Sequence, residues 1–226
     1  MSLGFMCSEL FWAGIMRNAS NKELLDLAVD DMGTPLSTLV FATNNQHKIE
    51  EAQAIVQGKL RLISLKEAGV DIEVDETANT FHGNALLKAQ AVWELTGLPC
   101  VADDSGLSVN FLKGEPGVYS ARYAGEAGNH AKNNEKLLKE LQGASDRSAY
   151  FITVLCVVGL EDTPIYLEGR VNGDILNELK GVDGFGYDPL FCPDGEVRSF
   201  AEMSAAEKNA MSHRGRAFSA LMEYLG

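Results

Sequence analysis

The chain has 226 residues, of which 46% are hydrophobic and 23% are charged, and its formal net charge at pH 7 is −13. This composition is typical of one globular domain, or of one domain with a lobe. The acidic balance, without a basic stripe, argues against a partner that is a nucleic acid polymer, and no apolar run is long enough to span a membrane. The four cysteines form no CxxC pair, so they fit free thiols in a reducing compartment such as the cytoplasm.

Residues 1–35 stand apart from the rest of the sequence. A short helix is expected over Asn21–Val29, and Gly33-Thr34-Pro35 then breaks the chain. We interpret residues 1–35 as an N-terminal extension, either partly helical or left from an expression vector, and residues 36–226 as the functional domain.

From Leu36 onward, short apolar runs alternate with runs of helical spacing. The apolar and β-branched runs predict strands over Ser37–Ala42, Leu60–Ser64, Cys100–Ala102, Tyr150–Leu160 and Pro164–Val171. Helical spacing and capping residues predict helices over Lys48–Val56, Thr80–Leu95, Asn129–Leu141 and Arg214–Leu225. Since alternation comes first and a hairpin follows, we expect an α/β fold with a mixed sheet and two lobes around a cleft.

The turn Thr43–Lys48 (TNNQHK) joins the first predicted strand to the first predicted helix of the domain. Backbone N–H groups, polar side chains and a lysine at a helix N-terminus favour an anion. The turn lacks the glycines of a P-loop, so on its own an ordinary capped turn is the simpler interpretation.

Two adjacent acids, Asp103 and Asp104, follow the short strand predicted at Cys100–Ala102. Ligands collect at strand ends in α/β sheets, and a carboxylate pair there is costly unless a cation compensates it. Mg²⁺ binds one or two carboxylates together with waters and substrate phosphates. The alternative is a surface turn, because Asp, Ser and Gly are turn formers.

Further charged residues precede and occupy the long helix. Asp71, Glu73, Asp75 and Glu76 form an acidic segment, of which one member could be a second metal ligand and the others a solvated loop. Lys88 shares a helix face with Asn84 and can reach either a phosphate or solvent.

The last third of the chain holds two more candidate segments. In Gly184–Pro189 (GFGYDP), the glycines that flank Phe185 permit close backbone approach, so the ring could stack on a planar base; the alternative is a tight loop with a core Phe. Lys208 and the pair His213-Arg214 can donate hydrogen bonds to phosphate or carbonyl groups, although such a pair is more often a solvated helix start.

Seven segments together resemble one family. In chain order they are FATNNQHKIEE, ETANTFHGNALLKA, ADDSGLSV, GEPGVYSARYAG, GRVNGDI, GFGYDPLF and FAEMSAAEKNAMSHRGRA. They resemble the inosine triphosphate pyrophosphatase (Ham1-like) family of non-canonical purine nucleoside triphosphate pyrophosphatases, from about Leu39 to the C-terminus. Ala78 departs from the family pattern, which usually has Gly there.

The resemblance implies two α/β lobes around an elongated sheet, a homodimer, and a site in the cleft. It implies hydrolysis of ITP, dITP or XTP to the monophosphate and pyrophosphate, with Mg²⁺ as cofactor. By the resemblance Asp104 is the proton acceptor and, with Glu76, a metal ligand, while Asp103 beside them is a support or a further ligand.

The resemblance also implies a set of substrate contacts, to which Lys88 is added from its place on the helix. They are Thr43, Asn44, Asn45, Gln46, His47 and Lys48 for the triphosphate, Ser105, then Phe185, Gly186, Tyr187 and Asp188 for base and ribose, and Lys208, His213 and Arg214. The alternatives are a pyrophosphatase for other modified nucleotides, a catalytically silent nucleotide-binding protein, or an interaction protein whose leading section docks a partner.

Overall fold

The computed structural model describes residues 37–126 and 128–226. The predicted helix Asn21–Val29 and the extension to residue 35 lie outside these residues. Within the described residues, no helix combines the length and the apolar character needed to cross a membrane.

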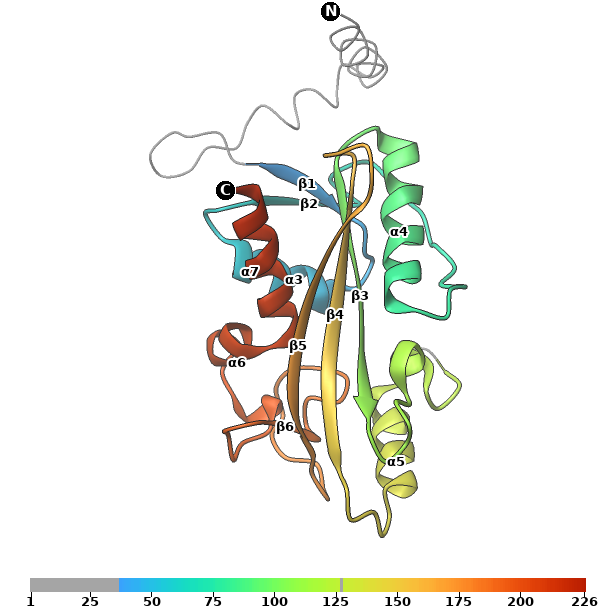
Figure 1. Ribbon diagram of the computed structural model, residues 1–226, viewed down its shortest axis with the longest axis vertical. Helices are drawn as coiled ribbons and strands as arrows, with labels where there is room; N and C mark the ends of the chain where they lie inside the picture. Colours follow the sequence, from blue (N-terminus) through green and yellow to red (C-terminus); the bar gives the residue numbers. More distant parts are fainter. Residues whose placement is uncertain (1–36, 127) are drawn as a thin grey trace, which may run out of the picture.

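A single twisted sheet forms the centre of the described part (Figure 1). Its six strands have the order β2-β1-β3-β4-β5-β6. Their bounds are β1 Thr38–Phe41, β2 Arg61–Ser64, β3 Cys100–Val109, β4 Ser148–Val158, β5 Ile165–Ile175 and β6 Phe191–Pro193. β1 is parallel to β2 and β3, whereas β3 to β6 pair antiparallel. The predicted mixed sheet and the predicted hairpin are therefore confirmed.

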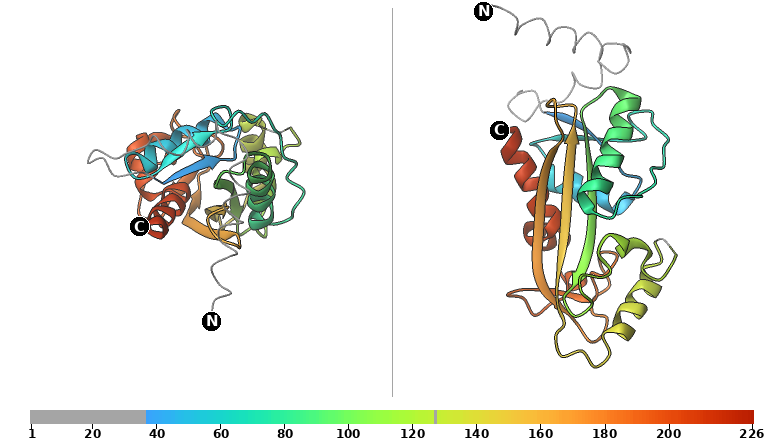
Figure 2. Two further views of the ribbon diagram at one scale, coloured as in Figure 1. Left: turned by 90° about the horizontal axis from the view of Figure 1, so that it is seen from above. Right: turned by 45° about the vertical axis from the view of Figure 1, so that its right-hand side comes forward.

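The helices lie on both sides of this sheet (Figures 1 and 2). Their bounds are α3 Gln46–Val56, α4 Phe81–Thr96, α5 His130–Glu140, α6 Ala205–Met211 and α7 His213–Leu225, with short 3₁₀ turns η1 Gly117–Arg122 and η2 Phe200–Glu202. Asn45, Thr80 and Asn129 cap α3, α4 and α5, since each accepts a hydrogen bond from a first-turn N–H. The four predicted helices are confirmed to within about two residues at each end, as is usual for cap-based boundaries.

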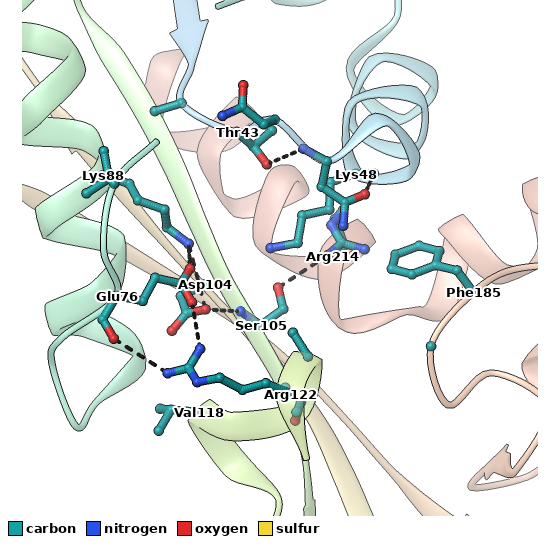
Figure 3. A pocket seen from close by; sticks show the side chains of 18 of the residues that line it. Thr43, Lys48, Glu76, Lys88, Asp104, Ser105, Val118, Arg122, Phe185 and Arg214 are labelled. Atoms are coloured by element: carbon teal, nitrogen blue, oxygen red, sulfur yellow. Dashed lines mark hydrogen bonds and ion pairs between the residues drawn. The ribbon is translucent and has the colours of Figure 1, made fainter. Parts of the chain in front are cut away.

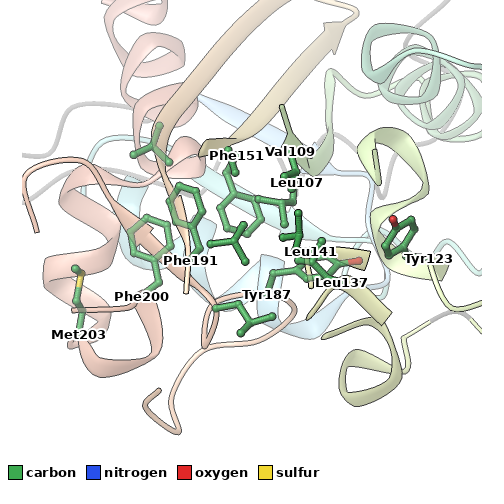
Figure 4. Close-up of a cluster of buried hydrophobic side chains, with 14 residues drawn as sticks. Leu107, Val109, Tyr123, Leu137, Leu141, Phe151, Tyr187, Phe191, Phe200 and Met203 are labelled. Atoms are coloured by element: carbon green, nitrogen blue, oxygen red, sulfur yellow. The ribbon is translucent and has the colours of Figure 1, made fainter. Parts of the chain in front are cut away.

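The three long strands β3, β4 and β5 run through two lobes (Figure 2). In the first lobe, α4 covers one sheet face through Ala85 and Ala89, while α3 and α7 cover the other through Ala52 and Phe218. The second lobe is built around aromatic side chains, among them Phe151 (Figure 4). The cluster joins β3, β4 and β5 to α5 and the segment after β5. The two lobes thus have separate hydrophobic clusters on shared strands, and a junction lies between them.

Two predicted strands are too short. The strand expected at Pro164–Val171 is β5, which continues to Ile175. The short strand expected at Cys100–Ala102 continues through the acids to Val109, and β4 pairs with all ten of its residues. Asp, Ser and Gly have low strand propensity, but pairing with a β-branched neighbour overrides it. β1 pairs with β3 only at Cys100 and Val101. Asp103 and Asp104 therefore lie in mid-strand, just beyond the end of β1.

Candidate functional site

A cavity of about 450 Å³ lies at the junction of the lobes, a size usual for small-molecule sites (Figure 3). The following predicted site residues line it: Thr43, Asn44, Asn45, Lys48, Glu76, Lys88, Asp104, Ser105, Phe185, Gly186, Tyr187, Asp188, Lys208, His213 and Arg214. Three others, Gln46, His47 and Asp103, are not among the lining residues. The fold thus brings together residues that are up to 171 positions apart in the sequence, from Thr43 to Arg214.

The turn before α3 is held by its own side chains. Asn45 N donates to Thr43 Oγ1 at 3.2 Å, and Lys48 N donates to Asn45 Oδ1 at 3.2 Å. Asn44 reaches across to the carbonyl of Ile72 at 2.8 Å. The N-terminal end of α3 is thereby fixed at the cavity, where the helix dipole favours an anion. Gln46 instead bonds to Glu50 on the outside of α3.

Asp103 and Asp104 have different surroundings because successive side chains of a strand point to opposite faces. Asp103 is fully buried, and its carboxylate lies 3.1 Å from Lys48 Nζ and 3.1 Å from Arg214 Nη2. Burial alone would raise its pKa, but the two cations outweigh burial and hold that pKa below its usual range. Asp103 is thus a fixed anion that orients Lys48 and Arg214, which favours the supporting role over that of a metal ligand.

Asp104 faces the cavity and α4. Its carboxylate accepts hydrogen bonds from Asn84 Nδ2 at 3.1 Å and from the Ser105 N–H at 3.0 Å, and Lys88 Nζ lies 3.8 Å away. Burial raises the pKa of Asp104 to about 6, with Lys88 opposing that rise and Glu76 adding to it. A buried carboxylate with so little compensation is suited to accept a proton or a cation near neutral pH.

Glu76 is the one half-buried acid of the segment 71–76, although the exposed Glu73 and Asp75 also line the cavity. Exposed acids alternate there with half-buried side chains, the latter being Ile72, Val74 and Glu76. Lys88 Nζ lies 2.5 Å from the Glu76 carboxylate and Arg122 Nη1 lies 3.5 Å from it (Figure 3). Burial opposes ionisation of Glu76, but Lys88 prevails and lowers its pKa. The apolar alternation of this segment is a sequence signal that selects Glu76 from the four candidates.

The pair Glu76 and Asp104 has the chemistry of a Mg²⁺ site. Lys88 lies between the two carboxylates and compensates only part of their charge. Within residues 37–126 and 128–226, no group of three or more His, Cys, Asp or Glu side chains could hold a metal ion. Two carboxylates completed by waters and phosphate oxygens are the usual Mg²⁺ pattern, so the residues fit this ion.

A series of ion pairs continues from Asp103 through Arg214 to the second lobe. Glu51 accepts from Arg214 Nη1 at 2.5 Å and from Lys208 Nζ at 2.6 Å, and Lys208 also donates to Asp188 at 2.6 Å. Arg214 is only 2% exposed and Lys208 only 4%. The interpretation of the pair His213-Arg214 as a solvated helix start is therefore wrong, because paired anions offset the cost of burying the cation.

His213 presents a neutral ring to the cavity. The ring is 5% exposed and stacks on Phe151, with 4.6 Å between centroids and 10° between planes. Burial, and then the charges of Arg214 and Lys208, lower its pKa well below 6.5. Nδ1 has no hydrogen-bond partner among the described residues. His213 is therefore a neutral imidazole at the cavity wall whose buried Nδ1 is unpartnered within the described residues.

The loop that carries Phe185 is tied down at three points. Asp188 accepts from the Phe185 N–H at 2.8 Å, the Tyr187 hydroxyl donates to the carbonyl of Ser120 at 2.9 Å, and Asn134 donates to the carbonyl of Gly186 at 2.9 Å. Gly184 and Gly186 have φ values of +74° and +64°, a region that favours glycine. The tight loop expected here is present, and it holds the half-buried Phe185 ring at the cavity.

Comparisons with known proteins agree on one family, since the Ham1 family profile matches residues 39–224. The chain belongs to the Ham1 family. It is 46% identical to a dITP/XTP pyrophosphatase of Porphyromonas gingivalis, over 84% of this chain and 98% of that protein. It is also 46% identical to a dITP/XTP pyrophosphatase of Clostridium perfringens, with the same coverage.

Solved structures of Ham1 proteins share the fold. The Staphylococcus aureus Ham1 protein superposes with a TM-score of 0.76 at 39% identity, over 84% of this chain and 98% of that chain. A nucleoside-triphosphatase / dITP/XTP pyrophosphatase from Mycobacterium abscessus superposes with a TM-score of 0.67 at 41% identity, over 81% of this chain and 98% of that chain. The resemblance drawn from the seven segments and the expected two-lobed fold are both confirmed.

The structure of this Ham1 protein adds residues that sequence reasoning did not select. Glu51 lies three positions after Lys48, so helical spacing could have pointed to it. Asn84 is fully buried, accepting from the Ala78 N–H at 3.0 Å and donating to Asp104. Arg122 lies on η1, which no periodicity predicts, and it meets Glu76 only because the tertiary fold places η1 beside that segment.

Proposed function

We propose that this chain is a Mg²⁺-dependent pyrophosphatase that hydrolyses dITP, XTP and ITP to the nucleoside monophosphate and pyrophosphate. The observation that carries the proposal is Asp104, a buried carboxylate with a pKa of about 6, at a cavity that also holds Glu76, Lys48 and Arg214. The relatives from Porphyromonas gingivalis and Clostridium perfringens, which this chain matches over 98% of their length, bear the name dITP/XTP pyrophosphatase. A site for binding alone would have no use for a carboxylate poised to accept a proton.

The triphosphate is assigned to the cationic side of the cavity. The N-terminal turn of α3 and Lys48 supply donors and positive charge, and Asp103 fixes the lysine in place. Neutralising the phosphate oxygens reduces their repulsion of the attacking water and stabilises the charge that develops on the leaving pyrophosphate.

Asp104 is assigned the role of accepting the proton of the attacking water. Its hydrogen bonds from Asn84 and the Ser105 N–H fix the carboxylate, so it can accept that proton without reorganising. Glu76 and Asp104 would hold Mg²⁺, which when bound orients the phosphates and lowers the pKa of bound water. Lys88, placed between the two carboxylates, would then be released to pair with a phosphate oxygen.

The purine base is assigned to the side lined by Phe185, His213 and Arg214. The ring of Phe185 offers a stacking surface, and donors from the other two can pair with the 6-keto oxygen of hypoxanthine or xanthine. Adenine presents an amino group there, so binding it would leave buried donors unpaired at a cost of about 1–3 kcal/mol each. Guanine shares the keto oxygen, so its 2-position must be distinguished by another contact.

We also propose that the enzyme is a cytoplasmic homodimer, as the family resemblance implies. Light scattering after gel filtration tests the assembly: a mass near twice the 24.5 kDa of one chain would support the dimer, and a mass near one chain would contradict it.

Pyrophosphate release from dITP, XTP, ITP, ATP and GTP, with Mg²⁺ or with a chelator, tests the proposed function. We expect Mg²⁺-dependent release from the first three and little from ATP or GTP. The variant Asp104→Asn should lose the activity by a factor of about 10³ or more, as expected for a proton acceptor that also binds the metal. Asp162→Asn, an exposed acid between β4 and β5, is the control.

The alternatives give different results in the same assay. Equal turnover of all five nucleotides, or turnover of other modified nucleotides alone, would replace the proposed specificity. Tight nucleotide binding without any turnover would identify a catalytically silent binding protein.

A further inference from the structure

His47 contacts Phe185, a residue on the proposed base side of the cavity. It is the second residue of α3, its side chain is exposed, and it is not among the cavity-lining residues. Its imidazole ring stacks on the ring of Phe185, with 5.1 Å between centroids and 14° between planes. The sequence placed His47 with the triphosphate turn, but this ring contact joins it to the residue proposed to stack on the base.

The stack connects parts of the chain that approach the cavity from different lobes. His47 belongs to α3 of the first lobe and directly precedes Lys48, whereas Phe185 belongs to a loop tied to α5 and η1 of the second lobe. His130 of α5 adds a tilted ring contact to Phe185, with 6.2 Å between centroids and 50° between planes. Imidazoles from two helices therefore contact the Phe185 ring.

The backbone contacts of the loop do not fix the ring itself. Asp188, Tyr187 and Asn134 hold the main chain around Phe185. The side-chain rotations of the half-buried ring are limited instead by contacts to the ring itself, from His47 and His130 and from the cations of Lys208 and Arg214, which lie 5.0 Å and 5.8 Å from its centroid. A parallel imidazole restricts those rotations before a ligand arrives, which reduces the ordering cost of binding. Because His47 sits beside Lys48 on the same helix, the stack also sets the distance between the stacking ring and the phosphate turn.

We infer that His47 is a positioning residue for the nucleobase, acting through the Phe185 ring and linking base recognition to the phosphate-binding turn. The inference rests on the proposed function for its kinetic consequence, whereas the stack itself is a property of the free protein. The chemical requirement at position 47 is then a flat ring, and hydrogen-bonding capacity is dispensable.

Three substitutions separate this role from phosphate binding. His47→Ala should raise KM for ITP by about three- to tenfold and change kcat less than about twofold, because it removes ground-state positioning only. His47→Phe keeps a flat ring without donors and should restore KM, whereas His47→Gln keeps a donor without a ring and should behave like His47→Ala. The opposite order, with His47→Gln active and His47→Phe impaired, would overturn the inference in favour of phosphate binding.

Product inhibition is a second, independent measurement on the same variants. His47→Ala should weaken inhibition by IMP and leave inhibition by pyrophosphate unchanged; weakened inhibition by pyrophosphate would contradict the inference. The matched control is His82→Ala, because His82 also contacts an aromatic ring, that of Tyr166, with 5.1 Å between centroids, and it does not line the cavity. A KM change in the control as large as in His47→Ala would also contradict the inference.

Nuclear magnetic resonance of the histidine ring protons tests the stack without any substrate. The four histidines of the chain give four sets of signals. In Phe185→Leu the signals of His47 should lose an upfield ring-current shift, while those of His82 remain. Unchanged His47 signals would show that the stack is absent. This measurement is independent of turnover. A wild-type enzyme that is inactive on ITP would therefore overturn the proposed function, whereas the histidine signals would still show whether the His47–Phe185 stack is present.

Discussion

Glu51 Oε2 accepts a hydrogen bond from Arg214 Nη1 at 2.5 Å, across 163 positions of sequence. The same carboxylate holds Lys208, so one anion of α3 orients two cations that line the cavity. Burial opposes ionisation of Glu51, but Arg214 and Lys208 outweigh it and lower its pKa. Glu51 therefore sets the positions of Arg214 and Lys208 without lining the cavity itself.

Glu51→Gln should remove this charge while conserving the shape of the side chain. Leaving two buried cations short of an anion should lower the free energy of unfolding by about 3 kcal/mol. It should also raise KM for ITP by about tenfold, which corresponds to the loss of one charge-assisted contact. Urea denaturation and steady-state kinetics measure the two effects. Glu50→Gln, at the exposed neighbouring position, should change neither; an unaltered Glu51→Gln would refute the positioning role.

Glu76→Gln should weaken Mg²⁺ binding and so lower the activity at low Mg²⁺ concentrations. Loss of one of two carboxylate ligands should raise the half-saturating Mg²⁺ concentration by about tenfold or more, since hydrogen bonds and contacts to charged groups contribute about 1.5–3 kcal/mol. Activity titrated with MgCl₂ provides the measurement. Asp71→Asn, an exposed acid of the same segment, should leave the titration unchanged. Equal titrations for Glu76→Gln and the wild type would exclude Glu76 as a ligand.

Asp104 should make the stability of the metal-free protein depend on pH. Its pKa rises from 3.8 to about 6 on folding, so its stabilising contribution is complete below pH 3.8 and is lost as pH rises through about 6. Above pH 6 the ionised group should cost about 3 kcal/mol, which is the free energy that corresponds to this rise in pKa. Asp104→Asn, which cannot ionise, should therefore be the more stable protein at pH 8.

Urea denaturation in chelator between pH 4 and pH 8 tests this expectation. The advantage of Asp104→Asn over the wild type should shrink steadily as pH falls below 6. Asp162→Asn, at an exposed position, should show no such trend. A difference that stays constant with pH would mean that Asp104 has an ordinary pKa in the folded protein.

Gly169→Ala should disturb the cavity from a position in the middle of β5. An added Cβ would lie 1.9 Å from the carbonyl oxygen of His213 and 2.4 Å from the backbone nitrogen of Ala217. Because both are backbone atoms of α7, the helix must shift away from the sheet, at a cost of about 1–3 kcal/mol or more. Thermal unfolding should show the loss, and KM for ITP should rise because His213 and Arg214 begin α7. Glu168→Ala, exposed on the same strand, is the control.

Local pattern was sufficient for most of the fold. The helices over Lys48–Val56 and Thr80–Leu95 and the hairpin after Tyr150 follow from periodicity, caps and a short link, all of which act between near neighbours in sequence. The seven segments likewise identified the family, and the family resemblance implied that Asp104 and Glu76 act together.

The tertiary structure decided the roles of residues whose contacts come from distant parts of the sequence. Asp103 and Asp104 are identical residues in sequence, yet the alternation of β3 gives one to Lys48 and Arg214 and the other to Asn84 and Lys88. β3 extends through these acids because β4 supplies its hydrogen bonds. Burial and charge pairing depend on which elements meet across the cleft, so the sequence determined the candidates and the packing determined their roles.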